Sequence, residues 1–140
     1  MKLTITCLLM LAVAVSASAQ QTRTYGWEDG VATAIGTYGS IGVIEVVTDV
    51  VRTGNYALHM TEDPLSSTPQ VYVAAIGALQ AGDQVTASFW SYDDTPGASP
   101  SSRIWGHWTT NADLLGYTGS AGGSDVYTSG IGWEEQTMTW

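Results

Sequence analysis

Apolar and polar residues alternate over short stretches of this chain, and Gly or Pro residues separate the stretches. Successive side chains of a β-strand point to opposite faces, so this alternation indicates strands that are half buried. No stretch after residue 20 keeps helical spacing over three turns. The pattern predicts strands at residues 41–50, 56–61, 70–76, 84–92, 103–110 and 134–140, and a long loop with one short strand at 116–132.

The connections between these stretches carry turn-forming residues. Residues 52–55, 81–83 and 93–97 supply Gly, Asn, Asp or Pro. Short strands joined by such turns predict an all-β fold, an antiparallel β-sandwich of the jelly-roll kind. The alternation of 134–140 continues up to Trp140, so we expect a further strand, from a longer chain or from a partner, to close the edge of the sandwich.

Residues 1–19 have the layout of a secretory signal peptide. Lys2 supplies a positive charge, residues 3–15 are largely apolar, and residues 16–19 are small and follow an A-x-A pattern. The apolar run is shorter than the roughly 20 residues that span a bilayer, which disfavours the alternative of a retained anchor. We therefore predict a secreted protein, extracellular or periplasmic, with one domain at 20–140. The only cysteine, Cys7, would leave with the signal peptide.

The charge is strongly one-sided. The chain has four Lys and Arg residues against thirteen Asp and Glu residues, a net charge of −9. Loss of Lys2 with the signal peptide would leave three arginines against thirteen acids, a balance of −10. This balance repels nucleic acid and anionic membranes, and it disfavours acidic glycans unless calcium bridges them.

Several motifs resemble a known family. Trp-Glu-Asp-Gly at 27–30, the turn and strand at 51–58, the central strand at 82–90 and Gly-Trp at 132–133 are similar to motifs of the cenC-like carbohydrate-binding modules. That family lies within the broader galactose-binding-like jelly rolls. The resemblance covers residues 25–140 and implies a β-sandwich that binds a polysaccharide or other glycan.

The resemblance also implies a structural calcium ion. In such modules an early acid, loop carbonyls and a late acid hold the ion, and Glu28 matches the early position. Calcium takes six to eight oxygen ligands, so the neighbouring Asp29 is a second candidate, and Asp93-Asp94 is an alternative pair. The late acid would lie beyond Trp140.

Candidate ligand residues lie on two consecutive predicted strands. Alternation places Trp90 and Tyr92 on one face of strand 84–92, and Arg103, Trp105 and His107 on one face of strand 103–110. Pairing of these strands through the 93–102 connection would gather all of these side chains. Aromatic rings stack on the apolar faces of sugars, and Arg and His donate hydrogen bonds to hydroxyls. The set predicts a non-catalytic site for a neutral polysaccharide; the alternative is that the tryptophans fill the core.

Two other classes of function remain open. A structural or adhesive cell-surface domain, with an assembly partner and no small ligand, has the same composition. A glycosidase needs two carboxyl groups about 5–10 Å apart, whereas Glu45 and Asp49 would lie about 13 Å apart along one strand. A polysaccharide lyase using His107 and a tyrosine would need an acidic substrate, which the charge disfavours. Motifs of serine hydrolases, zinc proteases and phosphate-binding loops are absent from the sequence.

Overall fold

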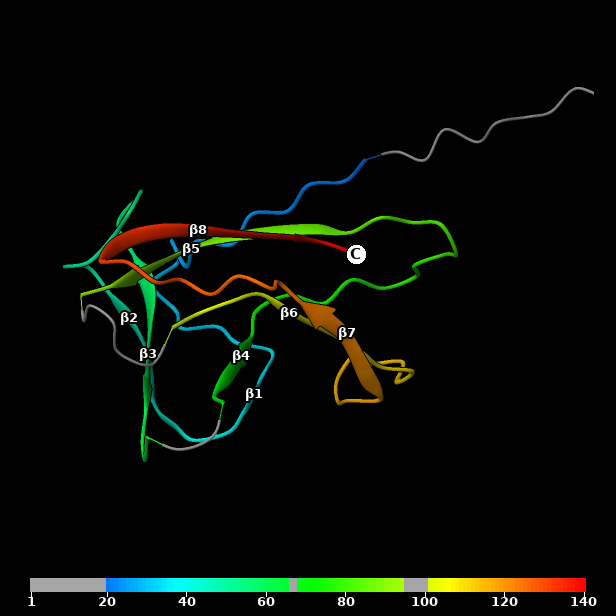
Figure 1. The fold of residues 1–140 in the computed structure, drawn as a ribbon, viewed down its shortest axis with the longest axis horizontal. Coiled ribbons are helices and arrows are strands. Elements are labelled where there is room, and N and C mark those ends of the chain that lie inside the picture. Colours follow the sequence, from blue (N-terminus) through cyan, green and yellow to red (C-terminus); the bar gives the residue numbers. More distant parts are fainter. Residues whose placement is uncertain (1–19, 66–67, 95–100) are drawn as a thin grey trace, which may run out of the picture.

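A computed structural model describes residues 20–65, 68–94 and 101–140 of the chain (Figure 1). The predicted signal peptide and most of the predicted turn at 93–97 lie outside the described residues. All regular structure in the described part is β, which confirms the all-β class. None of it is a helix long and apolar enough to cross a membrane.

The described residues form eight strands that pair, without exception antiparallel, into four two-stranded ladders. The pairs are β1 with β4, β2 with β3, β5 with β8, and β6 with β7. The bounds are β1 Gly36–Tyr38, β2 Ile41–Val47, β3 Ala57–Glu62, β4 Gln70–Tyr72, β5 Thr86–Asp93, β6 Trp105–Trp108, β7 Gly119–Gly123 and β8 Gly132–Thr139.

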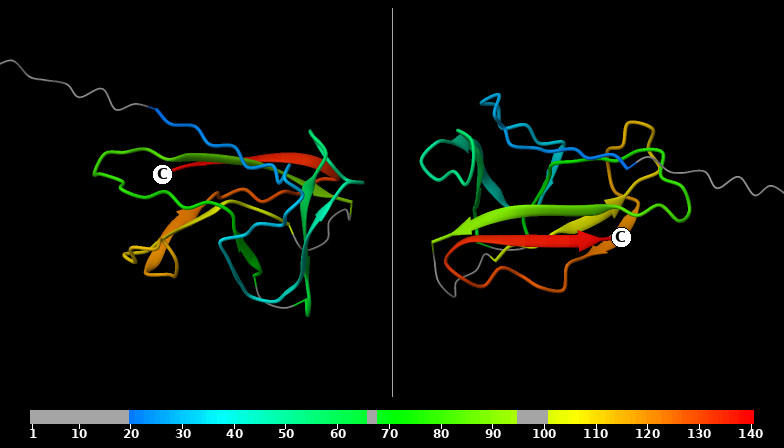
Figure 2. Two further views of the ribbon diagram at one scale, coloured as in Figure 1. Left: turned by 180° about the vertical axis from the view of Figure 1, so that it is seen from behind. Right: turned by 90° about the horizontal axis from the view of Figure 1, so that it is seen from above.

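The longest ladder, β5–β8, runs along one side of the molecule (Figure 1). The β2–β3 ladder runs across one end of it, and β6–β7 lies toward the other end, as the reverse view also shows (Figure 2). The β1–β4 ladder lies on the side away from β5–β8. The predicted sandwich is not seen, because the described strands remain separate pairs rather than joining into two sheets.

Most strands lie where the alternation predicts them. Each predicted strand overlaps an observed one, from β2 through β6 and at β8, and β7 is the short strand expected within 116–132. The observed β4 ends at Tyr72, four residues before the predicted end. The strand that the sequence did not predict is β1, whose Gly-Thr-Tyr is too short to show a period of two.

Glycine conformations explain two of the predicted turns. Gly54 and Gly82 have φ angles of 79° and 96°, a left-handed region that other residues rarely adopt. The turn before β5 is closed by a hydrogen bond from the Asp83 backbone N–H to the Gln80 carbonyl at 3.0 Å, and the Gln80 N–H donates to the Asp83 carboxylate at 2.8 Å. Both turns begin where the sequence places turn chemistry.

Apolar side chains in the described residues are only partly buried. None of these apolar side chains is fully buried, whereas the polar residues Ser124, Thr128 and Gln136 are only 5–7% exposed. These polar residues lie on β8 and on the segment that connects β7 to β8. The ladders are therefore held together by local contacts rather than by one large apolar core.

Trp140 provides one such contact between ladders. It extends the β5–β8 ladder, because its backbone N–H and carbonyl both bond to Val85, at 2.9 and 3.1 Å. Its indole N–H donates to the Gly122 carbonyl at 3.1 Å, and its ring lies against Gly106, where a Cβ would come within 2.9 Å of it. One tryptophan thus joins β5–β8 to β6–β7, and glycine provides the space for the ring.

Candidate ligand-binding surfaces

The β5–β8 ladder has one face open to solvent. On β5 the residues of this face are exposed and their neighbours are half-buried, so the period of two is visible in the structure. Directly opposite residues of an antiparallel pair share a face, and Trp90 is opposite Glu135 while Tyr92 is opposite Trp133. The exposed face of β5–β8 consists of Thr86, Ser88, Trp90, Tyr92, Trp133, Glu135, Thr137 and Thr139.

Aromatic rings gather at one end of this face. Trp90 and Tyr92 are 39% and 44% exposed, so neither ring is packed away between ladders. The centroids of the Tyr92 and Trp133 rings lie 5.4 Å apart with an angle of 58° between their planes. This tilted geometry is typical of favourable aromatic pairs, and it fixes two rings next to Trp90.

Polar groups border the rings. The guanidinium of Arg52, which comes from the turn between β2 and β3, lies 3.5 Å from the centroid of the Trp90 ring. Glu135 is exposed and directly opposite Trp90 across the ladder. At the other end of the face the hydroxyls of Thr86 and Thr139 bond to each other at 2.8 Å. The face therefore offers a donor and an acceptor beside Trp90, and hydroxyls at the end of the face away from the aromatic rings.

The predicted ligand residues on β6 form a second, separate group. The Arg103 guanidinium lies 4.1 Å from the centroid of the Trp105 ring and 4.5 Å from that of Tyr127, and it donates to the Ser124 carbonyl at 3.3 Å. Trp105 is 41% exposed. Arg103 is thus held between two aromatic rings, which leaves one face of each of those rings covered by protein.

His107 lies among tyrosines. Its ring centroid is 4.9 Å from that of Tyr117 and 5.5 Å from that of Tyr72, and both contacts are edge-on. These contacts join β4 to β6 and to the loop before β7. Partial burial raises the pKa of the Tyr72 hydroxyl above its ordinary value of 10.0, and the neighbouring Tyr38 and Tyr117 raise it further.

The pairing assumed for the predicted site does not form. β5 pairs with β8 along its whole length, and β6 pairs with β7, so Trp90 and Tyr92 lie on one ladder while Arg103, Trp105 and His107 lie on another. A direct link between the two regions is the 2.7 Å hydrogen bond from Ser102 to Ser91. Ser91 belongs to the half-buried face of β5, so this link lies on the side opposite to the exposed rings.

The acids predicted for calcium are held by N–H groups. The Glu28 carboxylate accepts hydrogen bonds from the backbone and side-chain amides of Asn55 at 3.0 and 3.2 Å and from the Tyr56 N–H at 3.4 Å. Asp29 accepts a bond from the Val31 N–H at 3.1 Å. Calcium requires oxygen ligands, and no cluster of three or more His, Cys, Asp or Glu side chains in the described residues suits a metal ion. The calcium site stays a prediction from the resemblance.

The two carboxylates considered for hydrolysis, those of Glu45 and Asp49, each have a partner of their own. Glu45 on β2 contacts His59 on β3, with 3.0 Å between the carboxylate and Nδ1. Asp49 lies beyond the end of β2 and accepts a hydrogen bond from the Val50 N–H at 3.1 Å. His59 is exposed on β3.

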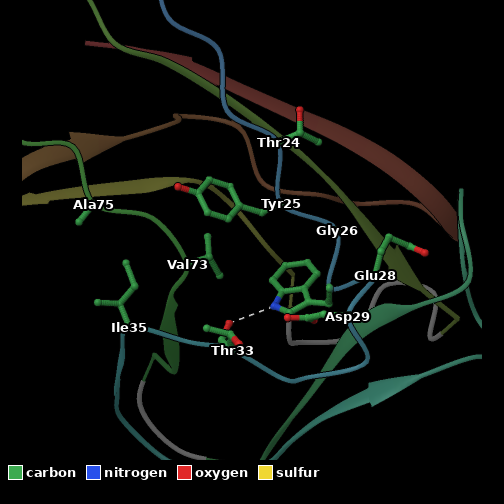
Figure 3. Close-up of a pocket in the computed structure, with 10 residues that line it drawn as sticks. Thr24, Tyr25, Gly26, Glu28, Asp29, Thr33, Ile35, Val73 and Ala75 are labelled. Carbon is green, nitrogen blue, oxygen red and sulfur yellow. Dashed lines mark hydrogen bonds between the residues drawn. The ribbon is translucent and has the colours of Figure 1, made fainter.

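A pocket of about 670 Å³ opens between the N-terminal segment and the β1–β4 ladder (Figure 3). Tyr25, Val73 and Ile35 surround the same space, whereas the Glu28 carboxylate points away from it (Figure 3). The full lining is Thr24, Tyr25, Gly26, Trp27, Glu28, Asp29, Thr33, Ile35, Val73 and Ala75. The volume is within the range of small-molecule sites, about 300–1,000 Å³.

Comparisons with known proteins add no relative: no family model matches the chain, and neither the curated proteins nor the solved structures contain a match. The resemblance to the cenC-like modules therefore stays a prediction from the motifs.

Five residues of these surfaces were not predicted as ligand residues from the sequence: Trp133, Glu135, Arg52, Tyr25 and Trp27. Trp133 was assigned only to the family motif, and Arg52 only to a turn and to that motif, because nothing in the local pattern shows which distant strand or turn a residue meets. Tyr25 and Trp27 line the pocket, but no strand pattern surrounds them in the sequence, and Trp27 was assigned only to the family motif.

Proposed function

We propose that this chain is a secreted, non-catalytic carbohydrate-binding domain that holds a neutral polysaccharide on the exposed face of β5–β8. The observation that carries the proposal is that the exposed rings of Trp90 and Tyr92 share one face of β5–β8 with the half-buried ring of Trp133. The proposed site keeps Trp90 and Tyr92 of the predicted set and combines them with residues of β8, because β5 pairs with β8 and not with β6.

The chemistry of this face suits a sugar. Pyranose rings have apolar C–H surfaces that stack on tryptophan and tyrosine, which are rigid and lose little conformational entropy on binding. Their hydroxyls need donors and acceptors, and Arg52 and Glu135 supply one of each beside Trp90. The net charge of −9 favours a neutral glycan over an acidic one.

The proposal is tested by affinity electrophoresis against a panel of neutral polysaccharides. Aromatic residues at the centre of a binding face typically carry most of the affinity, so Trp90→Ala should weaken binding about tenfold or more. The matched control is Trp108→Ala, which removes a tryptophan that is 49% exposed, against 39% for Trp90, from the β6–β7 ladder. Circular dichroism establishes that both variants fold.

Three outcomes would refute this assignment. One is that no polysaccharide of the panel retards the wild-type protein. Another is that Trp90→Ala binds as tightly as the wild type, and the third is that both tryptophan variants lose binding to the same extent. In the last case the loss would reflect general damage rather than a contact on β5–β8.

A structural or adhesive domain is the second candidate. It is favoured by the many large apolar side chains that are exposed in the described residues. Their number exceeds that expected for single apolar residues scattered over the surface of a monomer. On this view the ladders complete a sandwich by packing against a surface-assembly partner. Sedimentation velocity over a range of concentrations tests it: self-association supports an assembly role, and a strict monomer that binds glycan argues for the first candidate.

Export is part of both proposals. Cleavage after the small residues at 16–19 would leave Gln20 as the first residue of the mature protein. N-terminal sequencing of the protein recovered from the medium or periplasm checks this directly. Recovery only from the cytoplasm, with Met1 retained, would contradict it.

A further inference from the structure

The pocket beside the β1–β4 ladder has a wall that is held in a defined conformation. Trp27 has a φ angle of 54°, a left-handed conformation that is unusual for a bulky residue. Its carbonyl accepts the Gly30 N–H at 2.9 Å, and its indole N–H donates to the Thr33 carbonyl at 3.0 Å. Residues in such sparsely populated conformations persist when their surroundings hold them, and they concentrate at functional sites.

The remaining walls are mostly apolar and accessible. Tyr25 is 53% exposed, and Ile35 and Val73 are each 38% exposed, so the apolar groups around this space are in contact with water (Figure 3). Covering them would release that water with a favourable free energy. Because the Trp27 N–H is already bonded to Thr33, this ring presents only its π system and carbon edges to a ligand.

The charge of the pocket has one sign. Asp29 lines it, and no Lys or Arg is among the lining residues. One oxygen of Asp29 accepts the Val31 N–H, and the other accepts no hydrogen bond within the described part of the chain. The whole chain has a net charge of −9, so the surroundings of the pocket are also negative on balance. An anion would be repelled here, and a cation would be attracted both by the carboxylate and by the faces of the aromatic rings.

We propose that this pocket binds an organic cation, with an ammonium group near Asp29 and an apolar body between Tyr25, Ile35 and Val73. The site is separate from the exposed face of β5–β8 and does not rest on the glycan proposal. The recognition uses charge complementarity for the ammonium group and burial of apolar surface for the body. A neutral ligand of the same shape would lose the first contribution, and an anionic one would be repelled.

Three probes that share a phenyl body separate these contributions: benzyltrimethylammonium, benzyl alcohol and benzoate. Binding to the full chain is followed by the chemical shifts of the backbone amides of residues 25–31 in NMR titrations. We expect the cation to bind about tenfold more tightly than the alcohol, and benzoate not to bind. Equal binding of the cation and the alcohol, or the absence of binding by the cation, would overturn the proposal.

Matched variants test the role of the carboxylate. Asp29→Asn removes the charge but keeps an oxygen that can accept the Val31 N–H. Asp113→Asn is the control, because Asp113 accepts the N–H two residues ahead, that of Leu115, at 2.9 Å, and does not line the pocket. The first variant should reduce the affinity for the cation to that for the alcohol, and the second should change it less than twofold. Similar effects of both variants, or none from Asp29→Asn, would refute a direct contact.

Discussion

Gly106 on β6 tests whether the ladders depend on the contact with Trp140. An alanine at this position would place its Cβ 2.9–3.1 Å from three atoms of the Trp140 indole, whereas ordinary carbon contacts are about 3.5–4.0 Å. The ring would have to move by roughly half an ångström or more. That movement would strain the 3.1 Å hydrogen bond from the indole N–H to the Gly122 carbonyl.

The expected cost follows from these contacts. Overpacking costs about 1–3 kcal/mol, and a weakened hydrogen bond adds about 0.5–1 kcal/mol. The backbone of Gly106 does not have a positive φ angle, so alanine would gain about 0.5–1 kcal/mol from reduced chain entropy. The sum predicts that Gly106→Ala lowers the free energy of unfolding by about 2 kcal/mol, or the melting temperature by about 8 °C.

Urea unfolding followed by circular dichroism measures the change in the free energy of unfolding. The substitution Trp140→Phe should reduce the cost of Gly106→Ala, because the smaller ring leaves space for the new methyl group. The two substitutions should therefore show a coupling energy in a double-mutant cycle. Gly77→Ala is the control, since its Cβ would meet Leu114 at an ordinary 3.5 Å. The reasoning fails if Gly106→Ala is as stable as the wild type, or if its cost is unchanged when residue 140 is phenylalanine.

Three further predictions concern single side chains. Glu28→Ala removes the acceptor of the hydrogen bonds from Asn55 and should lower the free energy of unfolding, measured in urea, by about 1 kcal/mol. The effect is modest because the carboxylate is exposed, and no change would contradict this role. The raised pKa of Tyr72 means that the unfolded state loses its proton first, so its stabilising contribution is complete below pH 10 and disappears as the pH rises through the folded-state pKa. Urea titrations between about pH 9 and 11 should therefore show a smaller alkaline loss for Tyr72→Phe than for the wild type, and equal losses would count against it. Arg52→Ala should increase acrylamide quenching of tryptophan fluorescence and cost about 0.5–1 kcal/mol, because it uncovers one face of Trp90; unchanged quenching would be inconsistent with the stacking.

The strands themselves were largely predictable. In β5 the alternation of Thr86, Ser88, Trp90 and Tyr92 with smaller or apolar neighbours is strong enough to indicate both the strand and its two faces. The turn at Gly54 was predictable for the same local reason, because a glycine between polar residues supplies the positive φ that the chain needs there.

The candidate site was only half predictable. The sequence correctly places Trp90 and Tyr92 on one face, but it does not show that Trp133 and Glu135 lie across from them. About forty residues separate the two strands along the chain, and hydrogen bonds between backbones carry no sequence code for the partner. The prediction chose β6 as the neighbour of β5 because consecutive strands usually pair. In the structure β5 pairs with β8 instead, and β6 and β7, which lie between them in the sequence, pair with each other.

The amino-acid sequence by itself determined the all-β class, the position of most strands and the two faces of β5, because these properties depend on neighbours within a few residues. Only the tertiary structure decided which strands pair, that Arg52 lies over Trp90, and that Tyr25, Ile35 and Val73 surround one pocket. These contacts join residues far apart in the chain, and their geometry depends on how the ladders are arranged in space, which no local pattern encodes.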